Sequence, residues 1–416
     1  MMSEDRGFSG FISRARERGK LVVQPRMGFS SPVEMARGLA AVRAARALTV
    51  GTITLDSYTR TGQLDEARRA LADGIQLNGY PIVTHGPKVT REILGGVVSQ
   101  AFPVQVRHGS SLPGDIFNAI VDSGLVTTEG GPVSYCLPYN RTPLRLAVQE
   151  WRRCTELLAE RKHAHLETFG GCMLGQLCPP SMLIALSVLE GMFFAQHGIS
   201  SISLSYAQQT SAEQDREALA VLNRVASELL PGVEWHVVLY TYMGVFPATR
   251  AGALDLLGDA AMLAVRGGAE RLIVKTPVET HRIPTIEENV EALEFAAAAA
   301  EHERLRDEPP ANVVDTGLYD EVRALVERVL ELDNMIGSAL VRAFEAGYLD
   351  VPYCLHPDNR GATSSHLDSE GKLGWARTGS LPLPAVRGPA AELTSSDLLA
   401  ALSYVARSYD RVPVME

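Results

Sequence analysis

Short apolar runs alternate with longer amphipathic stretches from about residue 20 to about residue 300. Short runs bounded by glycine and proline predict strands, and the longer stretches have the spacing of apolar residues that is typical of helices. Strands that alternate with helices indicate βα units around a parallel sheet. The predicted strands are LVVQP, ALTVGTITL, YPIVT, FPVQV, GLVTT, HAHLET, SISLSY, EWHVVLY and ERLIVKT.

Nine predicted strands are one more than a (β/α)8 TIM barrel contains, so we expect either YPIVT or GLVTT to lie outside the sheet. The predicted helix starts agree with the alternation. Three of them have the S/T-x-x-E spacing of a capping box, namely Ser31 with Glu34, Thr210 with Glu213 and Thr285 with Glu288. The sequence therefore predicts an α/β fold, a (β/α)8 barrel with a C-terminal extension.

The alternation stops after about residue 300. The segment EHERLRDEPPANVVD is predicted to be an exposed connector into an amphipathic helix around residues 317–346, and the remainder is loop-rich. We therefore divide the chain into a catalytic barrel, residues 1–305, and a helix and loop extension, residues 306–416, that packs on the barrel. Loops of this kind cover a barrel, contact a partner chain, or lie on the surface without a specific role.

The composition narrows the class of protein. A net charge of −10 without any cluster of lysine or arginine argues against nucleic acid and acidic membranes as partners. The most apolar segment, residues 174–198, contains Pro179, Pro180 and Glu190, which predicts a buried helix rather than a membrane span. The first residues have no apolar stretch of signal-peptide length, so we expect a cytoplasmic protein.

Cysteine and histidine usage favours neither a disulfide framework nor a metal site. The five cysteines are an odd number without a CxxC pair, which is typical of reduced thiols that pack in the core. His163 and His165 lie on one face of a predicted strand, but a pair without a third ligand is more often structural. The chain also lacks the P-loop, GxGxxG, HExxH and GxSxG motifs.

Polar and charged residues gather where the predicted strands end. The carboxyl ends of the strands form the active-site mouth of a (β/α)8 barrel, so this arrangement indicates an enzyme. The residues are Arg26, Asp56, Arg60, Thr84, Arg107, Glu129, Glu167, Tyr206, Tyr242 and Lys275.

Three of these residues, Arg26, Arg60 and Arg107, indicate a site for a small dicarboxylate, because the planar guanidinium group binds carboxylates in a bidentate manner. Glu129 suits an ammonium group on the same ligand. Three arginines and one glutamate give a charge of about +2, against about −1 for an amino dicarboxylic acid at neutral pH. The predicted ligand is therefore glutamate-like, and His108 is the histidine that we place beside it.

Several segments, in the same order along the chain, resemble the epsilon chain of glutamate mutase, also called methylaspartate mutase. A weaker similarity continues through AFEAGYLDVPY. The segments are QPRMG, TLDSYTR, LNGYP, VRHGS, TTEGGPVSYCLPY, ETFGG, CPPSM, YMGVFP and IVKTPVETHRIPT.

The resemblance implies a TIM barrel that acts with a small cobalamin-binding partner, the sigma or S chain, in a dimer of barrels flanked by two partner chains. It implies adenosylcobalamin (coenzyme B12) as cofactor, held between the two kinds of chain, and a radical isomerisation of L-glutamate to (2S,3S)-3-methylaspartate. Partner domains of this class use a DxHxxG motif to ligate cobalt, and this chain lacks the motif. We therefore expect the cobalt ligand to come from the partner.

The resemblance also assigns roles to individual residues. Arg26, Arg60 and Arg107 correspond to the arginines that bind the substrate carboxylates, with His108 next to them. Glu129 corresponds to the carboxylate that faces the substrate amino group. Two tyrosines correspond to residues that line the pocket, Tyr135 and Tyr139. Seven residues correspond to positions that contact the cofactor, namely Gly28, Asn78, Pro138, Phe246, Lys275, Glu279 and Ile283.

Two departures and two alternatives accompany this interpretation. The segment SYAQQTSAEQD differs from the family pattern, and the chain is shorter than usual at both ends, so we expect the pocket wall, the dimer contacts and the lid residues to differ. One alternative is a cobalamin-dependent mutase for a related amino dicarboxylic acid. The other is a glutamate-binding scaffold subunit without turnover.

Overall fold

Eight parallel strands form a nearly closed barrel in this computed structural model, which describes residues 7–174, 177–279, 281–306, 313–385 and 394–410. The order in the sheet is β1-β8-β7-β6-β5-β4-β3-β2, and a parallel bridge between Val23 and Thr49 joins its two edges. The strands are β1 (Val22–Pro25), β2 (Gly51–Thr54), β3 (Val104–Arg107), β4 (Thr127–Gly130), β5 (His165–Thr168), β6 (Ser201–Ala207), β7 (Glu234–Tyr240) and β8 (Arg271–Val274). The predicted (β/α)8 barrel is confirmed.

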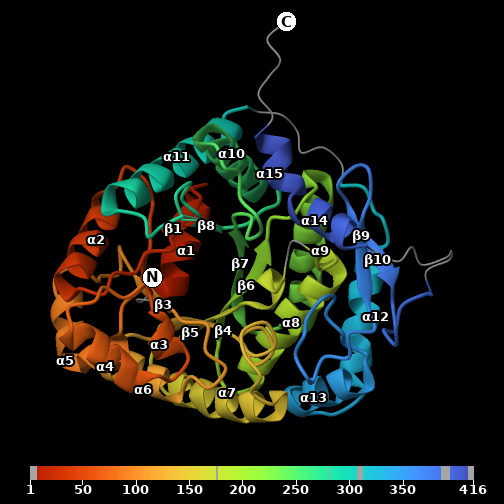
Figure 1. Cartoon of the computed structure of the whole chain (residues 1–416), viewed down its shortest axis with the longest axis horizontal. Helices are drawn as coiled ribbons and strands as arrows, with labels where there is room; N and C mark the ends of the chain where they lie inside the picture. The colour runs from red at the N-terminus through yellow and green to blue at the C-terminus, as the bar shows by residue number, and fades with distance from the viewer. Residues whose placement is uncertain (1–6, 175–176, 280, 307–312, 386–393, 411–416) are drawn as a thin grey trace, which may run out of the picture.

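Helices surround the barrel, and Figure 1 looks along its axis. They are α1 (Gly7–Glu17), α2 (Pro32–Ala44), α3 (Ser57–Arg60), α4 (Leu64–Ala72), α5 (Ile82–Leu94), α6 (Gly114–Asp122), α7 (Leu144–Ala159), the 3-10 helix η1 (Gly170–Cys172), α8 (Pro180–Gln196), α9 (Ala212–Leu229), α10 (Arg250–Arg266) and α11 (Ile286–Arg304).

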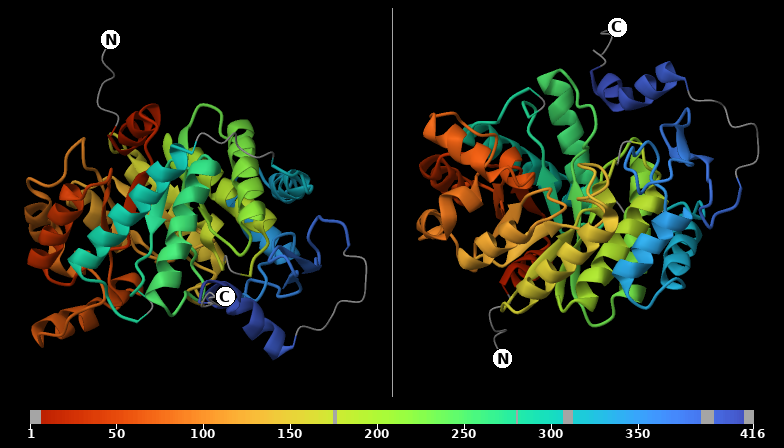
Figure 2. Two further views of the ribbon diagram at one scale, coloured as in Figure 1. Left: turned by 90° about the horizontal axis from the view of Figure 1, so that it is seen from above. Right: turned by 60° about the horizontal axis from the view of Figure 1, so that its bottom comes forward.

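The C-terminal extension lies beside the α8 and α9 side of the barrel (Figure 1). It contains α12 (Leu318–Leu330), α13 (Ile336–Ala346), the antiparallel hairpin β9 (Ser364–Leu367) and β10 (Leu373–Arg377), α14 (Ser395–Leu402) and α15 (Tyr404–Tyr409). The left view of Figure 2 shows α1 and α14 on opposite faces of the molecule. The N-terminal helix therefore covers one end of the barrel, and the C-terminal helices lie towards the other.

The segment that lies outside the sheet is YPIVT. Tyr80 makes a single bridge with Leu55, and Ile82 already begins α5. Pro81 at the helix start has no N–H group to donate to a strand ladder. GLVTT contains the first residues of β4 and belongs to the barrel.

Two of the three predicted helix caps are confirmed. Ser31 accepts a hydrogen bond from the Glu34 N–H, and Thr285 forms a complete capping box. The third was wrong by one residue, because Ser211 caps α9. The Thr210 hydroxyl instead donates to the Gly371 carbonyl oxygen at 2.6 Å, which joins the β6–α9 loop to the C-terminal hairpin.

The helix predicted around residues 317–346 is two helices. The chain turns between α12 and α13, where the Asp333 carboxylate accepts a hydrogen bond from the Met335 N–H. The first N–H of α13, from Ile336, donates to the Gln196 side chain of α8 at 2.9 Å. This contact from the barrel fixes the start of α13, which the apolar periodicity did not indicate.

Helix α8 has apolar residues on every side, and other elements of the fold cover it on every side. It packs on β5 and β6 and is covered by α9, α12 and α13, and almost all of its residues are buried. The predicted buried helix is confirmed. In the part of the chain that the structure describes, no helix has both the length and the apolar character needed to cross a membrane.

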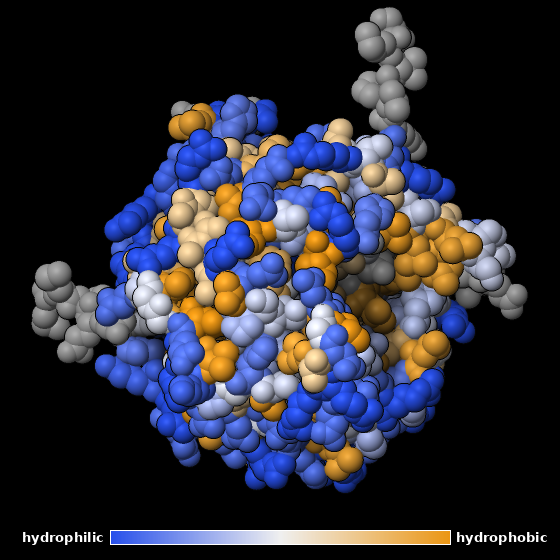
Figure 3. Space-filling view, turned by 60° about the vertical axis from the view of Figure 1, so that its left-hand side comes forward, coloured by the Kyte–Doolittle hydropathy of each residue, from blue (hydrophilic) through white to orange (hydrophobic). Residues whose placement is uncertain are grey.

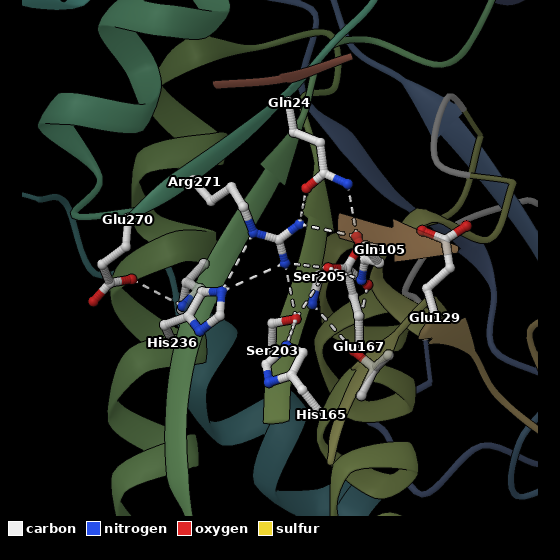
Figure 4. Close-up of polar contacts among 12 residues, drawn as sticks. Gln24, Gln105, Glu129, His165, Glu167, Ser203, Ser205, His236, Glu270 and Arg271 are labelled. Atoms are coloured by element: carbon white, nitrogen blue, oxygen red, sulfur yellow. Dashed lines mark hydrogen bonds and ion pairs between the residues drawn. The ribbon is translucent and has the colours of Figure 1, made fainter. Parts of the chain in front are cut away.

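The barrel interior is polar. Successive strand residues point alternately inward and outward, and the inward positions include a hydrogen-bonded set shown in Figure 4. Phe8 of α1 closes the lower end of this set, since its ring stacks on His165 at 4.6 Å and lies 5.0 Å from the Arg271 guanidinium carbon. The inward polar residues are Gln24, Gln105, His165, Glu167, Ser203, His236 and Arg271.

A buried carboxylate on α8 holds two loops at the opposite end of the barrel. Glu190 accepts hydrogen bonds from Val133 N–H, Ser134 N–H and Ser134 Oγ after β4. It also accepts from Phe169 N–H and Gly170 N–H after β5. Burial raises the pKa of Glu190 to about 7, although these hydrogen bonds oppose the rise. Gly131 is required beside it, because an added Cβ would lie 2.0 Å from the carboxyl group.

We expect Glu190→Gln to destabilise the protein. The amide group presents an N–H group where one carboxylate oxygen accepts, and each buried donor left without an acceptor costs about 1–3 kcal/mol. Thermal unfolding followed by circular dichroism should show a lower Tm. The exposed Glu345→Gln is a suitable control, and an equal Tm in both variants would contradict the role of Glu190.

Candidate functional site

Arg107 and Glu129 form a buried ion pair at the carboxyl ends of β3 and β4. Arg107 Nε donates to Glu129 Oε2 at 2.7 Å, and the two side chains are 6% and 1% exposed. Burial alone would lower the pKa of Arg107, but the adjacent Glu129 carboxylate raises it well above its usual value. The pair therefore places a permanent positive charge and its counter-ion side by side at the mouth.

Two tyrosines complete the surroundings of Glu129. The Tyr135 hydroxyl donates to Glu129 Oε1, and the Tyr240 hydroxyl lies 2.7 Å from Glu129 Oε2. The Arg107 guanidinium carbon lies 5.2 Å from the centre of the Tyr240 ring. Tyr139 packs edge-on against Tyr135 and is 52% exposed, which places it on the rim.

A second ion pair lies directly below the first. Tyr240 also hydrogen-bonds with Glu167 of β5, and Glu167 pairs with Arg271 of β8. Burial would raise the pKa of Glu167, but the Arg271 guanidinium and the hydrogen bonds from Tyr240 and Gln105 lower it below its usual value. Figure 4 shows Arg271 between Gln24, His236 and the Glu167 region.

His108 is neutral and lies beside Arg60. Its ring stacks on Trp151 at 5.7 Å, and Nδ1 accepts a hydrogen bond from the Ser110 N–H. Burial and the nearby Arg60 guanidinium lower the pKa of His108 to about 3. A Cβ at Gly109 would lie 3.6 Å from Arg60 Cδ, so the Arg60 side chain runs past this turn.

The opposite wall of the mouth holds a second charged cluster. Arg26 Nη1 lies 2.7 Å from Glu279 Oε1. The Lys275 ammonium lies 4.3 Å from the centre of the Phe246 ring and 3.5 Å from the Gly244 carbonyl oxygen. Burial and the Arg26 charge lower the pKa of Lys275 to about 8. This wall therefore joins a predicted substrate residue, Arg26, to three predicted cofactor residues.

The C-terminal helices support this wall. Asp410 accepts hydrogen bonds from the N–H groups of Ala248 and Thr249 at 2.8 and 3.0 Å. Val405 packs in the same apolar cluster as Phe246. The loop that carries Phe246 is therefore held from outside the barrel.

The remaining predicted cofactor residues lie on separate segments of the chain. Gly28 lies so close to the Thr54 carbonyl oxygen that an added Cβ would be 2.2 Å away. Asn78 accepts hydrogen bonds from the Ser57 N–H and hydroxyl. Pro138 lies one residue before Tyr139, and Ile283 is 46% exposed.

Several buried polar atoms at the mouth have no hydrogen-bond partner among the described residues. Such atoms are rare in folded proteins, and they indicate a polar ligand or ordered water at this place. They include Arg26 Nε, Thr54 Oγ1, Asp56 Oδ2, Arg60 Nε, Thr84 Oγ1, Tyr242 OH and Thr276 Oγ1. A large polar cofactor with several hydroxyl and amide groups fits this arrangement.

The surface also fits a ligand that enters from this end. Figure 3 shows a hollow on the side that faces the viewer of Figure 1, with apolar side chains gathered around it. The exposed apolar residues of the rim include Tyr139, Val245 and Ile283.

Some strand-end residues are structural. Tyr206 donates to Asp215 at 2.9 Å behind the barrel wall, and Asp56 caps α3. His163 lies outside β5 in a left-handed conformation, while His165 bonds with two serines. Among the described residues, no group of three or more histidine, cysteine or acidic side chains could hold a metal ion. All five cysteines have free thiols and are buried.

Tyr240 and Arg271 were not among the predicted site residues. Both occupy inward positions of their strands. The alternation of serine with apolar residues in SISLS indicates a polar interior face, whereas EWHVVLY and ERLIVKT, which contain Tyr240 and Arg271, show no such alternation. Glu190 appeared in the sequence only as an interruption of an apolar segment.

Comparisons with known proteins agree with the geometry. The chain is 32% identical over 402 residues to the glutamate mutase epsilon subunit of Yersinia enterocolitica, covering 92% of this chain and 82% of that protein. It is 30% identical over 400 residues to the glutamate mutase epsilon subunit of Escherichia coli O157:H7, with the same coverage. Among solved structures, the spore coat polysaccharide biosynthesis protein SpsE of Bacillus subtilis gives a TM-score of 0.41 at 10% identity. The match covers 86% of this chain and 84% of that one.

The sequence pattern of one protein family covers almost the whole chain. The family is described as "Methylaspartate mutase E chain (MutE)", and it matches residues 2–392. The order of its motifs along the chain and the two curated relatives lead to the same assignment. This chain therefore belongs to the methylaspartate mutase E chain family.

Proposed function

We propose that this chain is the catalytic subunit of an adenosylcobalamin-dependent glutamate mutase, an isomerase that converts L-glutamate to (2S,3S)-3-methylaspartate. The observation that carries the proposal is the buried Arg107–Glu129 pair at the barrel mouth. It offers a guanidinium group for a carboxylate and a carboxylate for an ammonium group at neighbouring positions. Membership of the family supports the same substrate.

The charges of the proposed substrate are complementary to those of the site. Four cations at the mouth, Arg26, Arg60, Arg107 and Lys275, face the two carboxylates Glu129 and Glu279. Among the described residues, the Arg60 side chain has no ion-pair or hydrogen-bond partner. We infer that Arg26, Arg60 and Arg107 bind the substrate carboxylates, and that Glu129 receives the ammonium group as Arg107 turns away from it. Tyr135 and Tyr139 then line the bound molecule.

The cofactor belongs on the opposite wall in this proposal. Adenosylcobalamin supplies a carbon radical that abstracts hydrogen from the substrate. In this proposal Lys275 and Glu279 offer a donor and an acceptor for a ribose. Other parts of the cofactor are contacted by Gly28, Asn78, Pro138, Phe246 and Ile283. The unpaired polar atoms at Thr54, Thr84 and Thr276 suit its polar groups. A small partner chain supplies the cobalt ligand, and the assembly is a dimer of barrels with two such chains.

The chain itself orients the substrate and shields it. Arginine clamps on both carboxylates hold the carbon skeleton in one position while groups migrate. Glu129 and its tyrosines keep the amino group fixed, and the buried floor below them excludes water from the reacting carbons. His108 is buried and neutral, so its ring N–H group can donate a hydrogen bond to a substrate carboxylate without adding a positive charge to the site.

A coupled assay tests the proposal. The chain, a cognate or surrogate cobalamin-binding chain, adenosylcobalamin and L-glutamate are combined, and 3-methylaspartate and the cob(II)alamin absorption spectrum are followed. Product that disappears when either chain is omitted supports the proposal. A cob(II)alamin signal without product indicates a related amino dicarboxylic acid as the substrate. Neither signal, with the two chains associated, indicates a non-catalytic scaffold.

We expect Arg107→Lys to lower turnover at least about tenfold, because lysine keeps the charge but loses the planar pair of donors. The coupled assay measures this effect directly. The control is Arg145→Lys on the exposed surface of α7, which should keep full turnover. Equal turnover in both variants would argue against a carboxylate clamp at Arg107.

We expect Lys275→Met to stabilise the protein at neutral pH. The pKa of Lys275 is about 8 in the folded chain and about 10.4 in an unfolded one, a difference worth about 3 kcal/mol at most. Below pH 8 the folded protein bears the full cost of the buried charge. Between about pH 8 and 10.4 the folded state loses its proton first, so wild-type stability rises with pH.

The Tm advantage of Lys275→Met should therefore be largest near pH 7 and should shrink above about pH 8. Thermal unfolding at a series of pH values measures it. The exposed Lys162→Met serves as control for the loss of one positive charge. A constant Tm difference across this pH range would rule out the buried charge as its cause.

A further inference from the structure

Tyr240 lies between two buried carboxylates. Its hydroxyl oxygen is 2.7 Å from Glu129 Oε2 and also contacts Glu167 Oε1. A phenol hydroxyl carries one proton, so it donates to only one carboxylate at a time. The position of that proton decides what Glu129 presents to a ligand.

The Glu167 carboxylate depends on the Tyr240 hydroxyl for one of its hydrogen bonds. Its Oε2 atom accepts hydrogen bonds from Arg271 Nη2, Gln105 Nε2 and Ser203 Oγ. Its Oε1 atom has no donor other than Tyr240 among the described residues, and the side chain is fully buried. Without Tyr240, a charged oxygen would be buried without a hydrogen bond, which is strongly unfavourable.

Glu129 does not need the same proton. Arg107 Nε donates to its Oε2 atom, and the Tyr135 hydroxyl donates to its Oε1 atom. Both of its oxygens therefore have donors from other residues. In this structure the Tyr240 hydroxyl lies within hydrogen-bonding distance of both carboxylates. A ligand donor that takes its place at Glu129 leaves the Tyr240 proton to Glu167.

When a ligand donates to Glu129 and Tyr240 donates to Glu167, the Tyr240 oxygen and Glu129 Oε2, 2.7 Å apart here, both accept from that ligand. Burial raises the pKa of Tyr240 well above its usual value, and so do the two carboxylates beside it, so the group remains a phenol. Arg107 and Cys172 are the other titratable groups that act on Tyr240. Two close acceptors favour a ligand that brings several N–H donors on one atom, as an ammonium group does.

We propose that Tyr240 is a positioning residue that sets specificity for the amino group of the ligand. By donating to Glu167, it turns its own oxygen towards Glu129 and forms with it a two-oxygen acceptor for an ammonium group. The site then selects amino dicarboxylates over dicarboxylates of the same length that lack the amino group. This inference rests on the proposed function, which supplies the dicarboxylate ligand.

The test compares the affinities of L-glutamate and glutarate for the full chain by titration calorimetry. Wild type should prefer glutamate. In Tyr240→Phe the preference should fall about tenfold or more, the effect expected for one hydrogen bond to a charged group. The matched control is Tyr206→Phe, which removes a buried barrel hydroxyl that contacts neither Glu129 nor Glu167.

A second variant reaches the same prediction by another route. In Glu167→Gln, the side-chain amide donates to Tyr240, whose proton then turns to Glu129. The acceptor pair is lost although the tyrosine is retained, so the preference for glutamate should fall again. A purely structural defect would weaken both ligands equally and leave their ratio unchanged.

The outcomes separate the two proposals. A lower ratio in both variants, with the wild-type ratio in Tyr206→Phe, supports the role of Tyr240. Glutamate binding with an unchanged ratio in Tyr240→Phe and Glu167→Gln overturns that role and leaves the proposed function intact. Wild-type protein that binds neither glutamate nor glutarate overturns the proposed function, and the inference fails with it.

Discussion

The ion pair between Arg271 and Glu167 holds the barrel interior together, with both side chains completely buried. Removing either partner would leave an uncompensated charge in the core, which costs several kcal/mol. The pair is stable here because its remaining hydrogen-bonding groups are satisfied by Gln24, Gln105 and Ser203 from three other strands. A polar interior therefore takes the place of the branched apolar side chains that usually fill such barrels.

This interior reaches the site through Tyr240, so the floor of the barrel and the mouth form one connected network. Other contacts act on the loops around it. Glu190 holds the loops after β4 and β5 from the outside, and Asp410 holds the loop after β7. The proposed substrate side thus depends on buried hydrogen bonds, whereas the proposed cofactor side depends on a helix from the end of the described chain. A substitution that removes one of these two sets of contacts leaves the other set in place.

Much of this arrangement could be predicted from the sequence. Arg107 and Glu129 were recognisable because a charge directly after an apolar strand falls at the barrel mouth. The extra predicted strand could not be identified from the sequence, because YPIVT has strand-like residues. In the structure this segment makes only one bridge, between Tyr80 and Leu55. The turn before α13 depends on Gln196, a residue 140 positions earlier. Arg271 was missed because a charged residue within a strand is normally interpreted as exposed.

The place of Arg271 in the chain has a consequence for synthesis on the ribosome. Glu167 emerges more than a hundred residues before its counter-charge, which lies in the last barrel strand. Until β8 has left the exit tunnel, a closed set of seven strands would bury an unpaired carboxylate. The nascent barrel should therefore remain open, with its interior hydrated, and close in a single late event. Ribosome-bound chains that end before residue 271 should accordingly stay protease-sensitive for as long as they are held.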